Sequence, residues 1–319
     1  MRVLSLYCGA GGMDEGLKQV GIKTTLAIDC EKDCIETMKL NHGCETIIGK
    51  VTDYLESFSD FDVIVGGPPC PEFSRAKADR SFDTTEINNF WSIVDKCKPK
   101  YHMMENVQDI IQVLKRQNFL VNCADYGVPQ TRVRRFYTNL LLPKQTHSKT
   151  PSSDLFGNPI QKWVSVKEAL GLDGRIYISS YGYSTQNREN ITRNIDEPAD
   201  TVVVANEMRI TNYKIKSLKK IRNRNPTYYK KHPANDIVSP CSTILNKDRG
   251  TEGYIHDNEY TRKLTNEELA TLQGFPKSYR FYGNKTSVRR QIGNAVPPQV
   301  IQAFFKQVPL PLIREVTKE

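Results

Sequence analysis

The sequence lacks several features that mark membrane, secreted and metal-binding proteins. No apolar run approaches the roughly 20 residues of a membrane-spanning helix. None of the eight cysteines forms a Cys-x-x-Cys pair, and neither His42 nor His102 lies at zinc-finger spacing from them. The amino-terminal residues run directly into a glycine loop, so we expect no signal peptide. These absences predict a reduced, intracellular protein in which most cysteines fill the core.

The charge balance is basic. The chain has 45 Lys and Arg residues against 36 Asp and Glu residues, which gives a net charge of +9 and a pI near 9.0. This excess predicts an anionic partner, most simply nucleic acid, although a well-solvated surface explains the same charge. The length of 319 residues allows one large domain and a smaller one.

The amino-terminal segment has the pattern of a nucleotide-binding unit. A strand over residues 3–7 is followed by a glycine-rich loop at 8–12 and a helix over 13–20, and a second strand at 24–28 ends at Asp29. The acid lies about twenty residues after the first loop glycine, the spacing at which a carboxylate holds ribose hydroxyls. This arrangement predicts a nucleotide-like cofactor.

The first turn of the helix after the loop indicates which kind of cofactor. Asp14 and Glu15 stand where a helix amino terminus otherwise attracts phosphate, and Asp14 replaces the third glycine of the dinucleotide pattern. Two acids suit a ligand with a cationic head, such as the amino and sulfonium groups of S-adenosylmethionine. That the two acids only complement the helix dipole remains the alternative.

A cysteine follows the fourth predicted strand. After a helix over 31–40 and a strand at 45–49, the apolar run Val63-Ile64-Val65 predicts a buried parallel strand that ends in Gly66-Gly67-Pro68-Pro69-Cys70. Ligands and chemistry collect at the carboxyl ends of such strands. Cys70 is therefore a candidate thiolate nucleophile on a rigid turn, or alternatively a small apolar residue that closes it.

An acid follows the next predicted strand. A helix over 86–97 ends before Pro99, and a fifth strand over 101–107 places Glu105 at its carboxyl end, beside the end that carries Cys70. A carboxyl group in a dry site can act as a proton donor. The alternative is that Glu105 and Asn106 only begin a helix over 107–115.

Two arginines form a further candidate pair. If the segment at 130–137 is extended, Arg132 and Arg134 project to one side and Val133 to the other. Two guanidinium groups on one face can hold a carbonyl oxygen or a phosphate. A solvated edge strand is the alternative structure.

The middle of the chain, from about residue 147 to 260, differs in composition. Short strands are predicted at 176–183 and 200–204, among many Asn, Thr, Lys and Tyr residues. The segment Lys214 to Arg224 is densely basic, and Tyr228-Tyr229-Lys230-Lys231 adds aromatic rings beside charge. These features favour contact with a nucleic-acid backbone, and a solvated basic helix is the alternative.

Taken together, the motifs resemble those of the DNA cytosine-5 methyltransferase family. Six blocks occur in the family's order: Tyr7-Cys8-Gly9-Ala10-Gly11-Gly12; Gly67-Pro68-Pro69-Cys70 with Phe73-Ser74; Glu105-Asn106-Val107; Gln130-Thr131-Arg132-Val133-Arg134; Arg262-Lys263-Leu264-Thr265 with Leu272-Gln273-Gly274-Phe275-Pro276; and Gln291-Ile292-Gly293-Asn294-Ala295-Val296-Pro297-Pro298. They cover both ends of the chain, and six blocks in order make the resemblance specific.

The resemblance implies a fold and a domain division. We expect an α/β fold, with a Rossmann-like S-adenosylmethionine-dependent methyltransferase domain over 1–147 plus 287–319. A smaller, mostly β target-recognition domain is expected over 148–286. The helix after Pro298 should return beside the first strand. The implied partner is double-stranded DNA, with no membrane, and we expect a monomer from a restriction-modification system. It should be cytoplasmic in a prokaryote and otherwise intracellular wherever DNA is.

The resemblance also implies residue roles. Cys70 would add to carbon 6 of a flipped-out cytosine, and Glu105 would hold ring nitrogen 3 and the exocyclic amine. Arg132 and Arg134 would lie near the carbonyl oxygen of the base. Carbon 5 would then take the methyl group of S-adenosylmethionine. The implied cofactor-binding residues are Tyr7, Gly9, Gly11, Gly12, Asp29, Cys30, Pro68, Asn294 and Ala295.

The chain departs from the family pattern at four places, one of which is the short segment between Val107 and Gln130. Pro71-Glu72 follows the cysteine where the family usually has Gln, and Asp29 replaces the more frequent Glu. Lys50 stands where an Asp usually contacts the adenine amine. Asp29, Lys50 and Phe73-Ser74-Arg75 also resemble the related transfer RNA methyltransferases, whereas residues 127–130 and the long region before Arg262 favour the DNA branch.

Two other readings remain open at the level of sequence. Pro71-Glu72 is the one feature that favours a catalytically silent DNA-binding relative. A nicotinamide-dependent enzyme is disfavoured by Asp14, which would repel a pyrophosphate.

Overall fold

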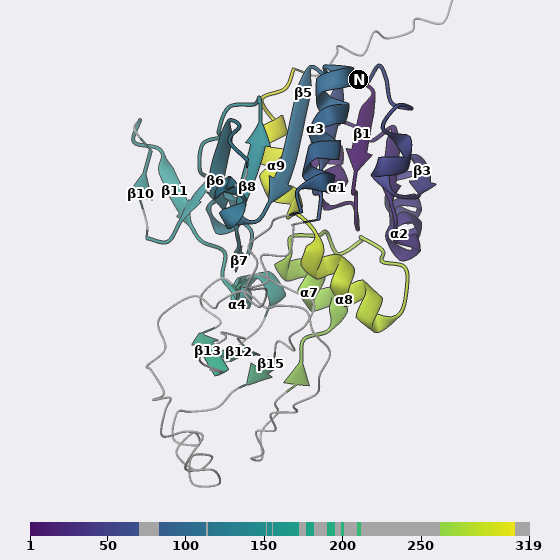
Figure 1. Ribbon diagram of the computed structural model, residues 1–319. Helices are drawn as coiled ribbons and strands as arrows, with labels where there is room; N and C mark the ends of the chain where they lie inside the picture. Colours follow the sequence, from purple (N-terminus) through teal and green to yellow (C-terminus); the bar gives the residue numbers. More distant parts are fainter. Residues whose placement is uncertain are drawn as a thin grey trace, which may run out of the picture.

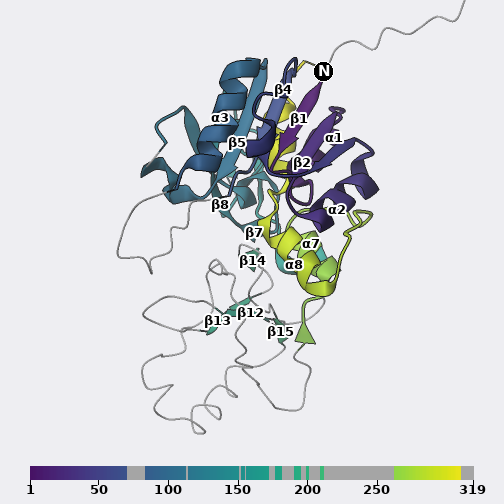
Figure 2. The same cartoon turned by 45° about the vertical axis from the view of Figure 1, so that its right-hand side comes forward.

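A seven-stranded sheet forms the centre of the described part of the chain (Figures 1 and 2). The computed structural model describes residues 1–69, 83–112, 114–150, 152–154, 156–171, 177–181, 190–194, 199–200, 209–211 and 262–309. The strand order is β3-β2-β1-β4-β5-β8-β6. The strands are β1 (Val3–Leu6), β2 (Leu26–Asp29), β3 (Glu45–Ile48), β4 (Val63–Gly66), β5 (Tyr101–Asn106), β6 (Asn118–Asn122) and β8 (Val133–Thr138).

The first five strands of this sheet are parallel, and β8 runs antiparallel to both β5 and β6. Every residue of β1 and of β4 is buried, as expected for parallel strands that are covered on both faces. The carboxyl ends of β1, β2, β4 and β5 therefore meet at one edge of the sheet. The expectation of a Rossmann-like α/β fold is confirmed.

Helices cover both faces of the sheet, as Figures 1 and 2 show. Successive strand residues alternate between the faces. Val3 and Val65 pack in one core cluster with α1 (Gly12–Lys18) and α9 (Pro298–Phe305). Leu4 and Ile64 pack in another cluster with α3 (Thr85–Cys97). The core therefore consists of two apolar layers with the sheet between them.

The apolar spacing of α3 explains its place in the structure. Its buried side chains recur at helical spacing and form one stripe: Ile87, Phe90, Trp91, Ile93 and Val94. The helix ends at Lys98, whose left-handed backbone (φ 46°) turns the chain before Pro99. The alternative interpretation, in which Glu105 and Asn106 only begin a helix over 107–115, is wrong: the structure has a short 3-10 helix, η2 (Gln108–Gln112), in that region.

The helix α9 packs directly on α1 and shares a core cluster with β1, which confirms the expected return of the segment after Pro298. Gly12 and Gly16 of α1 allow this contact. A Cβ atom at Gly12 would lie 2.2 Å from the Val296 carbonyl oxygen, and one at Gly16 would lie 2.4 Å from the Pro298 carbonyl oxygen. Only glycine fits this close backbone approach.

A third core cluster lies at the edge that carries the strand ends. It joins Ala10, in the glycine loop before α1, to three helices: α4 (Val166–Leu170), α7 (Asn266–Leu272) and α8 (Lys285–Asn294). The helix α2 (Lys32–His42) lies beside β2 and β3. Thr265 and Glu268 form a capping box that begins α7, and the Asn284 side chain caps α8.

The rest of the described chain contains short strands. They are β7 (Gln130–Thr131), β9 (His147–Ser148), β10 (Ser152–Ser153), β11 (Pro159–Lys162), β12 (Tyr177–Tyr181), β13 (Asn190–Asn194), β14 (Ala199–Asp200), β15 (Arg209–Thr211) and β16 (Arg262–Lys263). The strand expected at 176–183 is β12, and only the first residue of the strand expected at 200–204 is described. The basic segment 214–224 and the residues 228–231 lie outside the described residues.

Candidate active site and cofactor loop

The loop after β1 has a backbone that explains its glycines. Gly9 and Gly11 have φ angles of 53° and 74°, in the left-handed region that glycine enters without a steric cost. Tyr7 lies in the same region at φ 51°, which is uncommon for a residue with a side chain. A Cβ atom at Gly9 would have no neighbour within 4 Å. The loop thus presents open backbone beside Gly9.

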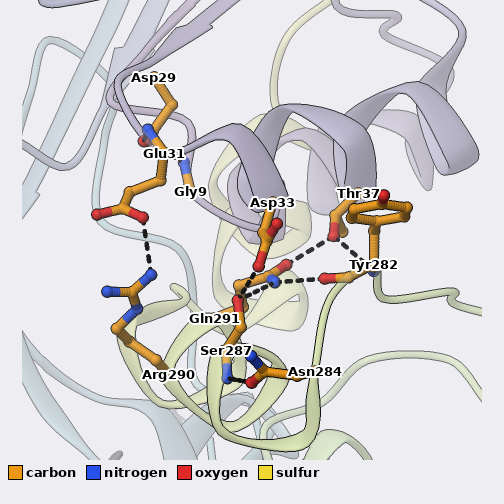
Figure 3. Close-up of polar contacts among 10 residues, drawn as sticks. All are labelled: Gly9, Asp29, Glu31, Asp33, Thr37, Tyr282, Asn284, Ser287, Arg290 and Gln291. Carbon is orange, nitrogen blue, oxygen red and sulfur yellow. Dashed lines mark hydrogen bonds and ion pairs between the residues drawn. The ribbon is translucent and has the colours of Figure 1, made fainter.

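Asp29, at the carboxyl end of β2, is tied to this loop (Figure 3). Its Oδ2 accepts a 2.9 Å hydrogen bond from the Gly9 amide, and its Oδ1 accepts one of 2.9 Å from the Glu31 amide. Burial raises the pKa of the Asp29 carboxyl, and the two backbone amides oppose that shift. The structure therefore brings Gly9 and Asp29 together, with one lone pair of each oxygen left for a further donor.

The two acids of the first helical turn are buried rather than displayed. Asp14 accepts hydrogen bonds from the hydroxyls of Ser5 (3.0 Å) and Thr24 (2.6 Å), and so joins α1 to the first strands. Glu15 lies 3.6 Å from the Lys18 ammonium. The structure gives Asp14 a packing role, and its charge still makes this helix terminus unsuitable for phosphate.

The loop that leaves β4 is fastened to the end of β5. The Asn106 side chain donates a 3.1 Å hydrogen bond to the Pro68 carbonyl oxygen. A Cβ atom at Gly67 would lie 3.7 Å from Glu105 Oε2. Cys70 itself, with Pro71 and Glu72, lies outside the described residues. The described part of the loop, up to Pro69, starts directly beside Glu105.

Glu105 and Arg134 face each other. Glu105 Oε1 lies 3.1 Å from Arg134 Nε, and Glu105 is only 8% exposed. Glu105 pairs with Phe136 in the antiparallel register of β5 and β8, so Arg134, two residues from Phe136, emerges on the same face as Glu105. Oε1 makes no hydrogen bond to any described residue. The result is an acid held by a guanidinium group at the strand edge.

Arg132 lies between β7 and β8, where the extended segment is interrupted. It is 3% exposed, and its guanidinium donates a 3.1 Å hydrogen bond to the Gly293 carbonyl oxygen. Burial and the charge of Arg134 lower the pKa of Arg132, and Glu105 opposes the shift. Both arginines therefore lie within electrostatic reach of Glu105.

Glutamines join the remaining motifs to this group. Gln130 Nε2 donates to the Leu272 carbonyl oxygen at 3.1 Å and to Gln273 Oε1 at 2.8 Å. Gln273 Nε2 in turn donates to the Ala295 carbonyl oxygen at 2.5 Å. The blocks around residues 130, 272 and 295, far apart in the sequence, meet here.

The other predicted cofactor residues are also placed. Cys30 is exposed beside Asp29, Pro68 is buried, and Asn294 is an exposed residue at the end of α8. Gly12 and Ala295 are buried. Their role as cofactor contacts stays a prediction.

Polar contacts between α2 and α8 form a connection that the sequence did not indicate (Figure 3). Thr37 donates to Gln291 Oε1 at 2.6 Å, and Gln291 Nε2 donates to the Tyr282 carbonyl oxygen at 2.7 Å. Glu31, two residues after Asp29, pairs with Arg290 at 2.7 Å. The helix α8 is thus bonded both to the Asp29 end of the sheet and, through Gly293, to Arg132.

Comparison with known proteins identifies this arrangement. A model of the C-5 cytosine-specific DNA methylase family matches residues 1–309. The chain belongs to this family. It is a DNA cytosine-5 methyltransferase, an enzyme that needs a methyl donor and acts on DNA. No helix among the described residues is long and apolar enough to cross a membrane.

Curated relatives match the methyltransferase over nearly its whole length. The Type II methyltransferase M.NgoFVII of Neisseria gonorrhoeae is 28% identical over 346 residues, which cover 98% of this chain and 87% of the relative. The Type II methyltransferase M.MthTI of Methanothermobacter thermautotrophicus is 27% identical, and the match covers 97% of each chain.

Solved structures support the fold of the methyltransferase. A mutant of Spodoptera frugiperda DNMT2 has a TM-score of 0.60 at 17% identity, and the match covers 96% of this chain and 98% of the other. An E. coli prophage protein described as a DNA modification methyltransferase has a TM-score of 0.56 at 21% identity, with 96% and 97% covered.

Proposed function

We propose that the enzyme transfers a methyl group from S-adenosylmethionine to carbon 5 of cytosine in duplex DNA, through a covalent adduct between Cys70 and a flipped-out base. The observation that carries this proposal is the pairing of Glu105 with Arg134 at the end of β5, directly beside the start of the loop that leads to Cys70.

The chemistry requires a nucleophile and an acid on the same base. Carbon 5 of cytosine is a poor nucleophile, so the Cys70 thiolate forms a bond to carbon 6 and pushes electron density to carbon 5. One oxygen of Glu105 faces ring nitrogen 3, to which it delivers a proton as the adduct forms, and the other accepts from the exocyclic amine. Arg134 holds the Glu105 carboxyl in place through its ion pair. Arg132, which donates to the Gly293 carbonyl oxygen, adds a second positive charge near Glu105. Once carbon 5 carries the methyl group, water takes the carbon 5 proton, the bond between Cys70 and carbon 6 breaks to release the thiolate, and ring nitrogen 3 returns its proton to Glu105.

The cofactor end of the site fits an adenosyl ligand with a cationic head. The open backbone at Gly9 leaves room, and Asp29 is fixed by two amides with lone pairs to spare for ribose hydroxyls. The acids under the loop disfavour a phosphate. When bound, S-adenosylmethionine supplies the methyl group. Contacts are proposed from Tyr7, Gly9, Gly11, Gly12, Asp29, Cys30, Pro68, Asn294 and Ala295.

A stacked base cannot reach Glu105, so the target cytosine must leave the duplex. We assign target recognition to residues 148–286 and catalysis to 1–147 plus 287–319, in a monomer. The net charge of +9 supports binding to a polyanion, and predicts an affinity that falls with salt.

A mechanism-based trap tests the proposal. Duplex DNA containing 5-fluorocytosine, with S-adenosylmethionine, should form a stable covalent adduct, because the fluorine cannot leave as a proton does. Cys70→Ala should form none, while the control Cys97→Ala, far along α3, should react like the wild type. Absence of both adduct and methylation at saturating cofactor would favour a catalytically silent protein.

The nucleic-acid substrate needs its own test. Transfer of labelled methyl groups is measured to duplex DNA and to transfer RNA in parallel. Incorporation into DNA at cytosine carbon 5 is expected. Incorporation into RNA alone would overturn the proposed substrate.

A further inference from the structure

Glu86 holds a carboxylate beside the cofactor loop, a feature that the sequence did not indicate. Glu86 Oε2 accepts a 2.8 Å hydrogen bond from the Tyr7 hydroxyl and one of 3.3 Å from Asn89 Nδ2. Its Oε1 accepts a longer one of 3.4 Å from the Thr52 hydroxyl. The donors come from the end of β1, from α3 itself and from η1 (Val51–Tyr54), so the carboxylate is fixed from three directions.

The charge of Glu86 is not matched by a described cation. No Lys or Arg among the described residues forms an ion pair with it, and its three hydrogen-bond donors are neutral. Lys50, two residues before Thr52 in the sequence, is exposed. A carboxylate has about four acceptor positions. Oε1, with one long bond, therefore retains the capacity to accept from a ligand.

The position of Glu86 corresponds to the nucleobase end of the proposed cofactor site. The methyl group must lie near the loop after β4, and the ribose lies at Asp29 on the end of β2. Because the strand order is β3-β2-β1-β4, a ligand that runs from β4 to β2 continues toward β3 and η1. Glu86 accepts a hydrogen bond from Thr52 of η1 there. Burial, then Asp29 and Glu31, and to a smaller extent Glu86, raise the pKa of Cys30, which places Glu86 within electrostatic reach of the residue after Asp29.

We infer that Glu86 determines the nucleobase specificity of the enzyme, by accepting a hydrogen bond from the exocyclic amine of the cofactor's adenine. The inference rests on the proposed use of S-adenosylmethionine. Lys50 carries donors only and cannot fill this role. A hypoxanthine ring presents a carbonyl oxygen in place of the amine, and a carboxylate would repel it. Tyr7 acts as the positioning residue, since its hydroxyl orients the carboxylate.

The experiment compares two ligands that differ only at this group. Calorimetry measures the Kd of S-adenosylhomocysteine and of S-inosylhomocysteine for the full chain. The wild type should prefer the adenosyl ligand by about 10- to 100-fold, the range of a hydrogen bond to a charged group. Glu86→Leu should reduce this ratio to about 3-fold or less. Glu86→Gln should also reduce it, because its amide can donate to the hypoxanthine oxygen.

A matched control removes a different carboxylate from the same helix. Asp95→Asn, on an exposed acid that pairs with Arg116, should leave the ratio unchanged. An unchanged ratio in both Glu86 variants would overturn this inference alone. Failure of the wild type to bind either ligand would overturn the proposed cofactor, and this inference with it. The ratio of two affinities reports recognition of the base, because a general loss of folding weakens both ligands equally.

Discussion

The hydroxyl of Thr37 donates a 2.6 Å hydrogen bond to Gln291 Oε1, across 254 positions of sequence. Both residues are buried, at 0% and 2% exposed. Thr37 lies on α2, which begins just after Asp29, and Gln291 lies on α8, whose Gly293 carbonyl holds Arg132. The cofactor end and the base end of the site are thereby fixed to one helix.

Replacement of Gln291 should destabilise the protein. Gln291→Leu leaves the Thr37 hydroxyl and the Tyr282 carbonyl without this partner, at a cost of about 1–3 kcal/mol for each buried group that stays unsatisfied. Urea unfolding measures the loss. In the double variant with Thr37→Val the two effects should be less than additive, because both remove the same bond. Arg290→Ala, which breaks only an exposed ion pair, should cost at most about 1 kcal/mol.

Gly16→Ala should lower the free energy of unfolding, whereas this change usually raises it in a helix. In an open helix interior, alanine stabilises by about 1 kcal/mol relative to glycine. Here the new methyl group would lie 2.4 Å from the Pro298 carbonyl oxygen and 2.6 Å from Ile301 Cβ, so α9 must shift. We expect a loss of about 1–3 kcal/mol in thermal or urea unfolding. Stabilisation would show that α1 and α9 do not pack this closely.

Glu105→Gln should impair catalysis and spare cofactor binding. The amide keeps the size of the side chain but cannot transfer a proton, and loss of a general acid costs about 10²- to 10⁴-fold in rate. Single-turnover methylation measures the rate, and calorimetry with S-adenosylhomocysteine measures binding. The control Glu45→Gln, on an exposed residue of β3, should leave both unchanged. A wild-type rate in Glu105→Gln would remove this residue from the mechanism.

Stability should fall as the pH drops below about 6.5. Burial lowers the pKa of His42, His102 and His147. A histidine with a lowered folded-state pKa is protonated first in the unfolded chain, so its contribution is present above the unfolded pKa and is lost as the pH falls. The urea midpoint at pH 5.5 should lie below that at pH 7.5. An equal or higher midpoint at pH 5.5 would contradict this.

His42 offers a variant for the same measurement. The Tyr279 hydroxyl donates to the Ala10 carbonyl oxygen, so its oxygen accepts from His42 Nε2 at 3.0 Å, and the ring can stay neutral. His42→Gln retains a donor but does not titrate, and should reduce the difference between the two midpoints. Burial raises the pKa values of Asp29 and Asp125. Their contribution to stability therefore increases as the pH falls, opposite to that of the histidines, and does so at lower pH.

The hydrophobic pattern of short stretches predicted the individual strands and helices whose residues are close in the sequence. The apolar run Val63-Ile64-Val65 indicated the buried parallel strand β4, and the pattern of residues 3–7 indicated the strand β1. The alternative in which Glu105 and Asn106 only begin a helix over 107–115 is excluded by the short 3-10 helix η2, which no local pattern indicated.

The contacts that complete the site could not be read from the sequence. Thr37 and Gln291 look like ordinary polar residues of two separate helices, and Glu86 like a favourable acid in a first helical turn. Their partners depend on how distant elements pack. Arg132 was predicted as one of two arginines near the base, and no local pattern indicated that its guanidinium donates to the Gly293 carbonyl oxygen.

The contact of α9 with α1 also has a consequence for synthesis. The first helix to leave the ribosome remains without its covering partner until the last described helix has emerged. Val3, Leu17 and their neighbours become fully buried only when Val300 and Phe304 pack against them. Such distant pairing is slow to form and leaves apolar surface exposed meanwhile. Newly made chains should therefore depend on chaperones until the carboxyl-terminal segment is free.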